Sequence, residues 1–235
     1  MDRVLVLLRH GHSEWNLTDR FTGWTDIPLT DMGLAEGADA GRRLAQAGYR
    51  FDEVHVSVLQ RTQQMAAAVL AAMQAPDVPV YATWRLNERH YGALQGLNKQ
   101  EIFSTWGEQE SRRWWRGYAT PPPAVDLNDP RHPRFDPHYA ALPPDELPAT
   151  ESLADCQRRM LPYWNDVLAP RLRAGGRLLV ISHGNTLRGL VMQLEHLSAE
   201  VMEHVEIAPG VPLIYHFSPE LTLQSKEWLD ITVDE

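Results

Sequence analysis

Two apolar runs that each end in a histidine–glycine pair constrain the fold of this chain more than any other feature. Residues 5–11 read Leu-Val-Leu-Leu-Arg-His-Gly, and residues 178–184 read Leu-Leu-Val-Ile-Ser-His-Gly. Apolar runs of this length are too short to span a membrane and indicate strands buried on both faces. Ligands of open α/β sheets bind at the carboxyl ends of strands, and neighbouring strands lie only ~4.8 Å apart. We therefore expect His10 and His183 to face each other across a site.

The rest of the chain alternates between helical and strand patterns, as an α/β fold requires. Thr30 is a plausible N-cap for a helix to about residue 47, with Leu34, Ala38 and Ala45 on its apolar side. A second helix is expected over 57–75, with Arg61 in its first turn. A long helix opening at 150 should run to about 174, bent or broken at Pro162 and Pro170. Further strands are expected at 51–56, 80–81, 213–217 and 221–228, and further helices at 99–106, 109–116, 186–195 and 198–204.

Length and composition predict one domain of 235 residues, with a surface insertion at about 119–150. Nine of the seventeen prolines fall within 121–148, and few aliphatic residues accompany them. The N-terminus lacks the layout of a signal peptide and no apolar stretch reaches membrane length, so a cytoplasmic protein without a membrane partner is expected. The net charge of −9 argues against nucleic-acid binding, which needs a positive surface.

The residues around the two histidines favour an anion over a metal ion. Arg9 precedes His10 directly, and a cation beside a metal ligand opposes the binding of another cation. A neutral imidazole is a nucleophile toward phosphorus, and nearby arginines lower its pKa and neutralise phosphate oxygens. Arg61 lies where the amides and dipole of a helix start reinforce anion binding. Phosphoryl transfer also needs an acid, and Glu88 is the best-placed carboxyl.

These motifs together resemble the cofactor-dependent phosphoglycerate mutases of the histidine phosphatase superfamily. The matching segments are residues 9–11, 13–16, 20–24, 86–99, 163–165 and 183–185. The resemblance runs from the first strand to about residue 217. Arg-His-Gly is common to the whole superfamily, whereas the 88–99 block is far more specific.

The resemblance implies an α/β three-layer sandwich with a mostly parallel mixed sheet flanked by helices. It implies interconversion of 3-phosphoglycerate and 2-phosphoglycerate through a phosphohistidine that 2,3-bisphosphoglycerate primes, without a metal, in a dimer or tetramer. His10 would be the nucleophile and Glu88 the acid and base. The other implied catalytic residues are Arg9, Arg61 and His183. The implied substrate-binding residues are Asn16, Thr22, Gly23, Arg89, Tyr91, Lys99, Arg116, Gly184 and Asn185.

Three departures from the family pattern keep other functions open. His12 stands where the family usually has glutamate, and Trp115 replaces the first of two adjacent arginines. The chain after Trp228 is short and acidic, whereas family members often carry a longer tail that closes over the site. A weaker lid would admit water and raise hydrolysis relative to transfer. The alternatives are therefore a phosphatase of small phosphorylated metabolites on the same scaffold, and a phospholigand-binding protein without catalysis.

Overall fold

The computed structural model describes residues 3–229, and the acidic residues 230–235 of the expected tail lie outside them. The described residues form a mixed six-stranded sheet in the order β3-β2-β4-β1-β5-β6. β1 to β4 run parallel to one another, and β5 and β6 each run antiparallel to the neighbour before it. The strands are β1 Arg3–Arg9, β2 Glu53–Val56, β3 Val80–Ala82, β4 Arg177–Ser182, β5 Leu213–Phe217 and β6 Leu223–Trp228.

The two apolar runs form the neighbouring central strands β1 and β4, as predicted. Successive side chains of a strand point to opposite faces, so Leu5 and Leu7 enter the core on one face while Val6 and Leu8 enter the other. Leu8 is level with Ile181, and the N–H of His10 donates to the carbonyl of Ser182 at 3.1 Å. This register brings His10 next to the residue that follows β4.

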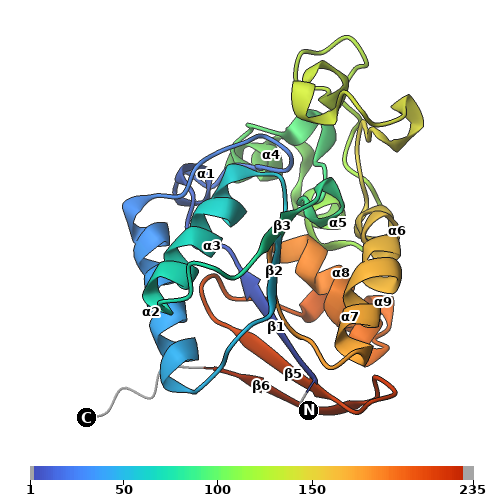
Figure 1. Cartoon of the computed structure of the whole chain (residues 1–235). Coiled ribbons are helices and arrows are strands. Elements are labelled where there is room, and N and C mark those ends of the chain that lie inside the picture. The colour runs from blue at the N-terminus through green and yellow to red at the C-terminus, as the bar shows by residue number, and fades with distance from the viewer. Residues whose placement is uncertain (1–2, 230–235) are drawn as a thin grey trace.

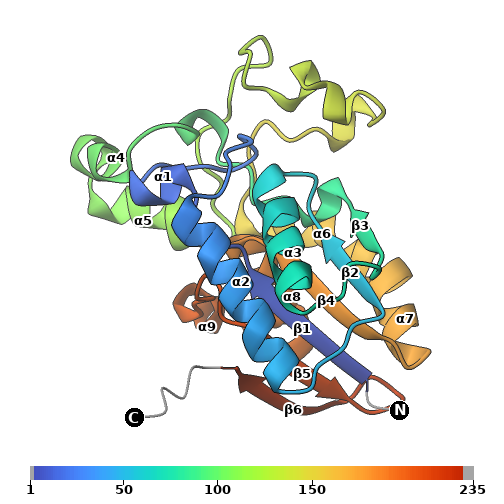
Figure 2. The ribbon, with the colours of Figure 1, turned by 60° about the vertical axis from the view of Figure 1, so that its left-hand side comes forward.

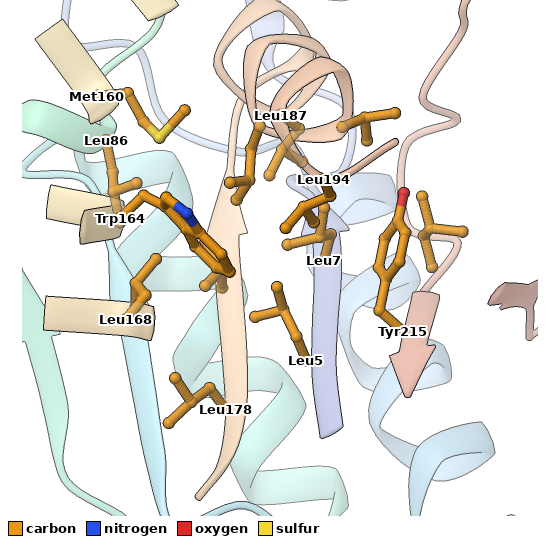
Figure 3. Packing of buried hydrophobic residues seen from close by; sticks show 14 of the residues in the cluster. Leu5, Leu7, Leu86, Met160, Trp164, Leu168, Leu178, Leu187, Leu194 and Tyr215 are labelled. Atoms are coloured by element: carbon orange, nitrogen blue, oxygen red, sulfur yellow. The ribbon is translucent and has the colours of Figure 1, made fainter. Parts of the chain in front are cut away.

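Helices cover both faces of the sheet, which confirms the three-layer α/β class (Figure 1, Figure 2). α2 and α3 pack on one face, and α6, α7 and α8 pack on the other. Figure 3 shows the second face, where Leu5 and Leu178 meet Trp164 and Leu187. The helices are α1 Glu14–Leu17, α2 Asp31–Gln46, α3 Gln60–Ala72, α4 Lys99–Trp106, α5 Glu108–Arg116, α6 Leu153–Tyr163, α7 Ala169–Arg173, α8 Gly184–Glu195 and α9 Ala199–His204.

The buried face of α2 differs from the predicted apolar side. Leu34 is 38% exposed, and glycines take part in the buried face instead. A Cβ on Gly37 would lie 2.9 Å from Met65 Sδ, and one on Gly41 would lie 2.5 Å from the carbonyl of Val69. α2 and α3 are therefore too close for larger side chains at these two positions. The predicted extent of the helix is confirmed, with Thr30 as its N-cap and Ala47 as its C-cap.

The structure corrects several predicted boundaries. The long helix begins at Leu153 behind a Ser152 N-cap. Its α-helical part ends at Tyr163, directly after Pro162, and resumes at Ala169, directly before Pro170, so the predicted interruptions are present. A π-helical turn, Trp164–Leu168, joins α6 to α7 and absorbs the register change. α3 starts at Gln60, after a loop in which Ser57 accepts from Leu59 N–H, so the prediction of helix from 57 was wrong. α1 is absent from the predicted helices, and Ser13 and Asn16 form a capping box for it.

The loops that follow the parallel strands gather at one end of the molecule. α1, α4, α5 and the proline-rich residues 119–150 lie there in both views (Figure 1, Figure 2). Residues 119–150 hold three single 3₁₀ turns and no strand. Between residues 3 and 229, none of the helices is both long and apolar enough to cross a bilayer.

Candidate active site

A cavity of about 340 Å³ lies at the carboxyl ends of β1 and β4. Every site residue predicted from the sequence lines it except His183 and Arg89, which are fully buried behind its wall. The lining consists of Arg9, His10, Asn16, Arg20, Phe21, Thr22, Gly23, Arg61, Glu88, Tyr91, Lys99, Trp115, Arg116, Gly184, Asn185, Arg188, Glu206, Ile207, Ala208 and Pro209. Six of these side chains are cationic and two are carboxylates, so a chain of net charge −9 has a locally positive cavity.

His10 is held in one tautomer by its own loop. Its Nδ1 lies 2.7 Å from the carbonyl oxygen of Gly11. A carbonyl only accepts, so Nδ1 carries the proton and the lone pair of the neutral ring lies on Nε2. Burial, followed by the positive charges of Arg61 and Arg9, holds the pKa of His10 well below the usual imidazole range. The ring therefore stays neutral and nucleophilic at physiological pH.

His183 supports Arg61 from behind. The two histidine rings lie 5.0 Å apart between centroids, at 68° to each other. Arg61 Nε donates to His183 Nδ1 at 3.2 Å, and His183 Nε2 lies 2.9 Å from Ser57 Oγ. The Nη atoms of Arg61 donate to the carbonyls of Thr25 and Gly23. Both ring nitrogens of His183 are thus engaged by protein, and its effect on a bound anion passes through the guanidinium.

Arg9 offers a donor that protein does not use. Its Nη1 donates to the carbonyl of Ile207 at 2.9 Å, which fixes the guanidinium at the wall of the cavity. Its buried Nε has no hydrogen-bond partner among the described residues. A Cβ on the adjacent Gly184 would lie 3.5 Å from that nitrogen. Such an unsatisfied donor is costly unless an anion binds there. His10, Arg61, His183 and Arg9 are referred to below as the histidine cluster.

Glu88 is fixed from two sides. Its Oε1 accepts from the N–H of Arg89 at 2.7 Å and from the N–H of Asn185 at 3.2 Å. Its own carbonyl accepts from Trp24 Nε1 at 2.6 Å. The second donor, Asn185, is in the first turn of the helix that follows His183. The predicted acid is therefore held against the same strand end as the histidine cluster.

A buried ion pair holds the loop that carries Glu88. Arg159 and Glu151 make two hydrogen bonds, of 2.7 and 3.0 Å, with both side chains almost completely buried. Arg159 also donates to the carbonyls of Asn87 and Glu88, and Glu151 accepts from the N–H of His90. The pair therefore ties α6 to residues 87–90.

Replacing Glu151 by alanine should lower the free energy of unfolding by about 3–5 kcal/mol, because Arg159 would remain buried without a counter-charge. Urea denaturation followed by circular dichroism measures this change. The matched control is Glu108→Ala, which removes an exposed partner of Arg112 and should cost about 0.5 kcal/mol or less. An equal fall in the free energy of unfolding in the two variants would show that the buried pair contributes no more to stability than the exposed one.

His90, in the same loop, makes stability depend on pH. Burial lowers the pKa of this imidazole to about 3, while Gly92 N–H donates to its Nδ1 at 3.0 Å. The unfolded chain takes up a proton near pH 6.5 that the folded chain refuses, so stability is full above that pH and falls as the pH drops toward 3. The slope from this group reaches about 1.4 kcal/mol per pH unit. The free energy of unfolding, measured between pH 7 and 4, should depend less steeply on pH for His90→Asn than for wild type, and equal slopes would contradict the prediction.

A second set of charges surrounds Trp115, on the same cavity. The Lys99 ammonium lies 5.5 Å from the centre of the Trp115 ring, and the Arg116 guanidinium lies 4.7 Å from it. Each cation also has an internal carboxylate partner: Asp19 at 2.6 Å from Lys99, and Glu206 at 2.5 Å from Arg116. Lys99, Trp115, Arg116 and Glu206 form the tryptophan cluster. Trp115 thus stacks with both cations instead of adding a third.

The other predicted binding residues complete the wall. Asn16 accepts from the N–H and hydroxyl of Ser13 through its Oδ1, which turns its amide nitrogen away from Ser13. Asn185 Nδ2 donates to the hydroxyl of Tyr91 at 3.0 Å. Arg89 donates to the carbonyls of Trp114 and Trp115 and lies 4.5 Å from the centre of the Tyr91 ring. Arg89 therefore fixes α5 and Tyr91 in place. Thr22, Gly23 and Gly184 line the cavity.

Several lining residues were not predicted from the sequence. Arg188 lies one helical turn after Asn185 and donates to its Oδ1 at 3.0 Å, so the i, i+3 spacing could have indicated it. Arg20 and Phe21 fall inside the 20–24 motif but had been given no role. Glu206 to Pro209 come from the loop before β5, and no local pattern in the sequence marks that loop.

The matching family model is that of the histidine phosphatase superfamily (branch 1), over residues 5–221. The chain belongs to this superfamily. The chain is also 46% identical over 219 residues to a 2,3-bisphosphoglycerate-dependent phosphoglycerate mutase of Hamiltonella defensa subsp. Acyrthosiphon pisum (strain 5AT), covering 93% of this chain and 88% of that protein. The family model and the mutase relative together confirm the resemblance to the cofactor-dependent phosphoglycerate mutases that the sequence motifs indicated.

Solved structures of the superfamily's fold superpose over nearly the whole chain. A mycobacterial glucosyl-3-phosphoglycerate phosphatase complexed with VO3 matches with a TM-score of 0.68 at 21% identity, covering 91% of this chain and 92% of that one. An alpha-ribazole phosphatase from Shigella flexneri matches with a TM-score of 0.66 at 23% identity, covering 99% and 100%. At these identities the likeness establishes the fold. Across residues 3–229, no group of three or more histidine, cysteine or acidic side chains is placed to hold a metal ion.

Proposed function

We propose that this chain is a 2,3-bisphosphoglycerate-dependent phosphoglycerate mutase that interconverts 3-phosphoglycerate and 2-phosphoglycerate. The observation that carries the proposal is that one cavity joins the histidine cluster to the tryptophan cluster. A neutral nucleophile with guanidinium groups suits the transferred phosphoryl group. Lys99 and Arg116 supply further cations for a carboxylate and a second phosphate. The 46% identity to a mutase over most of both chains supports the same substrate.

In the proposed mechanism each residue has a step. Phosphorylated His10 donates its phosphoryl group from Nε2 to the free hydroxyl of a monophosphoglycerate, while Glu88 accepts the hydroxyl proton. His10 then takes back the other phosphoryl group as its P–O bond breaks, and Glu88 returns the proton to the departing oxygen. Arg9 and Arg61 neutralise the equatorial oxygens during both transfers. His183 keeps Arg61 in position.

The residues present fit the priming group. 2,3-Bisphosphoglycerate supplies the phosphoryl group that first loads His10. The unsatisfied Arg9 Nε and the buried Arg61 would hold that phosphoryl group, and Lys99, Arg116 and Arg188 would hold its second phosphate and carboxylate. Asn16, Thr22, Gly23 and Asn185 would add hydrogen bonds. We also propose that the protein acts in the cytoplasm as a dimer or tetramer, as the family resemblance implies.

One assay tests the proposal against hydrolysis and against binding alone. The protein is incubated with 3-phosphoglycerate and a trace of 2,3-bisphosphoglycerate, and both 2-phosphoglycerate and free phosphate are followed. The proposal predicts isomer formation much faster than phosphate release, with no loss of activity in a chelator. Faster phosphate release would make the protein a phosphatase, and an absence of turnover would make it a binding protein.

Glu206 should weaken substrate binding in the wild-type protein. Replacing it by glutamine removes a negative charge from the cavity and releases Arg116 from its ion pair, so we expect KM for 3-phosphoglycerate to fall by about two- to fivefold. Little change in kcat is expected, because Glu206 pairs with Arg116 and, among the described residues, makes no hydrogen bond to His10 or Glu88. Steady-state kinetics at fixed ionic strength measures both constants. A rise in KM would show instead that Glu206 positions Arg116 for binding.

A further inference from the structure

The carboxylate of Glu36, on α2, holds the backbone of the nucleophile loop. Its Oε2 accepts from the N–H of His12 at 2.8 Å, and its Oε1 lies 2.7 Å from His12 Nδ1. On the other side of the residue, the carbonyl of His12 accepts from the N–H and the hydroxyl of Thr30, at 3.0 and 2.9 Å. Both backbone polar groups of His12 are therefore fixed by the start of α2.

The His12 N–H belongs to the same peptide group as the Gly11 carbonyl. That carbonyl accepts the Nδ1 proton of His10 at 2.7 Å. A peptide group is planar, so fixing its N–H also fixes the direction of its oxygen. A carboxylate that accepts from the N–H further polarises the group and makes the oxygen a stronger acceptor. Glu36 is thus linked to His10 by two consecutive hydrogen bonds across one peptide plane.

Glycines surround the contact between Glu36 and the nucleophile loop. A Cβ on Gly11 would lie 2.5 Å from Glu36 Oε2, and a Cβ on Gly33 would lie 2.2 Å from the His12 carbonyl oxygen. Gly210, whose N–H donates to the carbonyl of Arg9, would place a Cβ 3.2 Å from that of Glu36. Glycines on three segments therefore allow the carboxylate to approach the loop.

We propose that Glu36 is a positioning residue for the nucleophile: through the 11–12 peptide it directs the Gly11 carbonyl at His10 Nδ1 and so keeps the lone pair on Nε2. This inference rests on the proposed role of His10 as the phosphoryl acceptor. The His12 side chain is a second hydrogen-bond partner of the same carboxylate. It is not required for the connection from Glu36 to His10, because every residue except proline keeps the backbone N–H.

Three variants test the link. Glu36→Ala removes the acceptor, Glu36→Gln keeps an oxygen for the His12 N–H but loses the charge, and His12→Gln replaces the ring while keeping the N–H. For Glu36→Ala we expect phosphorylation of His10 to slow by about 10- to 100-fold, the range usual for partners that orient a functional histidine. The phosphorylation rate of Glu36→Gln should lie between those of Glu36→Ala and wild type. The rate of His12→Gln should stay within about threefold of the wild-type rate. KM should change little in all three.

Nitrogen-15 spectra of histidine-labelled protein give a readout that is independent of turnover. The His10 signals, assigned by their loss in a His10 variant, should report the Nδ1–H tautomer in wild type and His12→Gln, and a mixture of tautomers in Glu36→Ala. If Glu36→Ala does not fold, the slower phosphorylation of Glu36→Gln carries the test. The inference would be overturned if both Glu36 variants were phosphorylated at the wild-type rate. It would also be overturned if Glu36→Gln and His12→Gln lowered the phosphorylation rate equally. Unlabelled wild-type His10 would instead refute the proposed function, whatever the tautomer.

Discussion

Replacing His10 by alanine should abolish the phosphoenzyme and lower kcat by between about 10⁴- and 10⁶-fold, as the loss of a nucleophile does in other enzymes. Within residues 3–229, no other group on the cavity combines a neutral nitrogen nucleophile with two flanking guanidinium groups. The His183 ring lies 5.0 Å from that of His10, but both of its nitrogens are engaged by Arg61 and Ser57. Incubation with radiolabelled 2,3-bisphosphoglycerate, followed by detection of acid-labile label on the protein, measures the intermediate directly.

The control for this experiment is the exposed histidine variant His138→Asn. His138 lies in the proline-rich segment, where its side chain is largely exposed and pairs with Asp136. Its removal should leave both labelling and turnover unchanged. Persistent acid-labile label in His10→Ala would place the nucleophile elsewhere and would leave the histidine cluster as a binding site alone.

Replacing Glu88 by glutamine should lower kcat by about 10²- to 10⁴-fold, the usual contribution of a positioned acid or base. Glutamine keeps an oxygen that can accept from the N–H groups of Arg89 and Asn185, so the loop should keep its place. What is lost is the proton transfer. Steady-state kinetics on 3-phosphoglycerate measures the loss, and calorimetric melting confirms that the variant is folded.

A change of substrate separates proton transfer from positioning at Glu88. p-Nitrophenyl phosphate carries a leaving group that departs without a proton, so phosphorylation of His10 by this compound should be much less sensitive to Glu88→Gln. Glu206→Gln is the matched variant, because it neutralises the other carboxylate on the same cavity without touching the acid. A comparable loss with both substrates would contradict the assignment of Glu88 as the acid and base.

The strand pair and its two histidines could be predicted because their signals are local. Runs of apolar residues define β1 and β4, and the change to polar residues marks the carboxyl end of each strand. By contrast, the orientations of Arg89 and His183 depend on carbonyl and hydroxyl groups brought in by α5 and by the loop after β2. Those contacts are set by tertiary packing, which is why these two residues, both predicted to be in the site, lie behind the cavity wall.

The same reasoning explains what the helical pattern missed. The apolar pattern of α2 placed Leu34 on the buried side. The close approach of α3 instead requires small residues there, Gly37 and Gly41, and glycine does not contribute to a hydrophobic pattern. Glu206 comes from a loop without periodicity, more than one hundred positions after Glu88. Charged residues from such loops can be placed at a site only once the sheet order is known.

The ion pairs of Lys99 and Arg116 with carboxylates of the same chain affect how strongly an anion can bind in this cavity. In the proposed complex, a substrate anion that engages these two cations competes with Asp19 and Glu206, which are tethered to the same chain. The competitor therefore has an effective concentration set by the fold rather than by the ionic strength of the solution. Substrate binding is then a competition between the anion and two carboxylates of the protein. The backbone positions of residues 19 and 206 determine how tightly the anion must bind to win it.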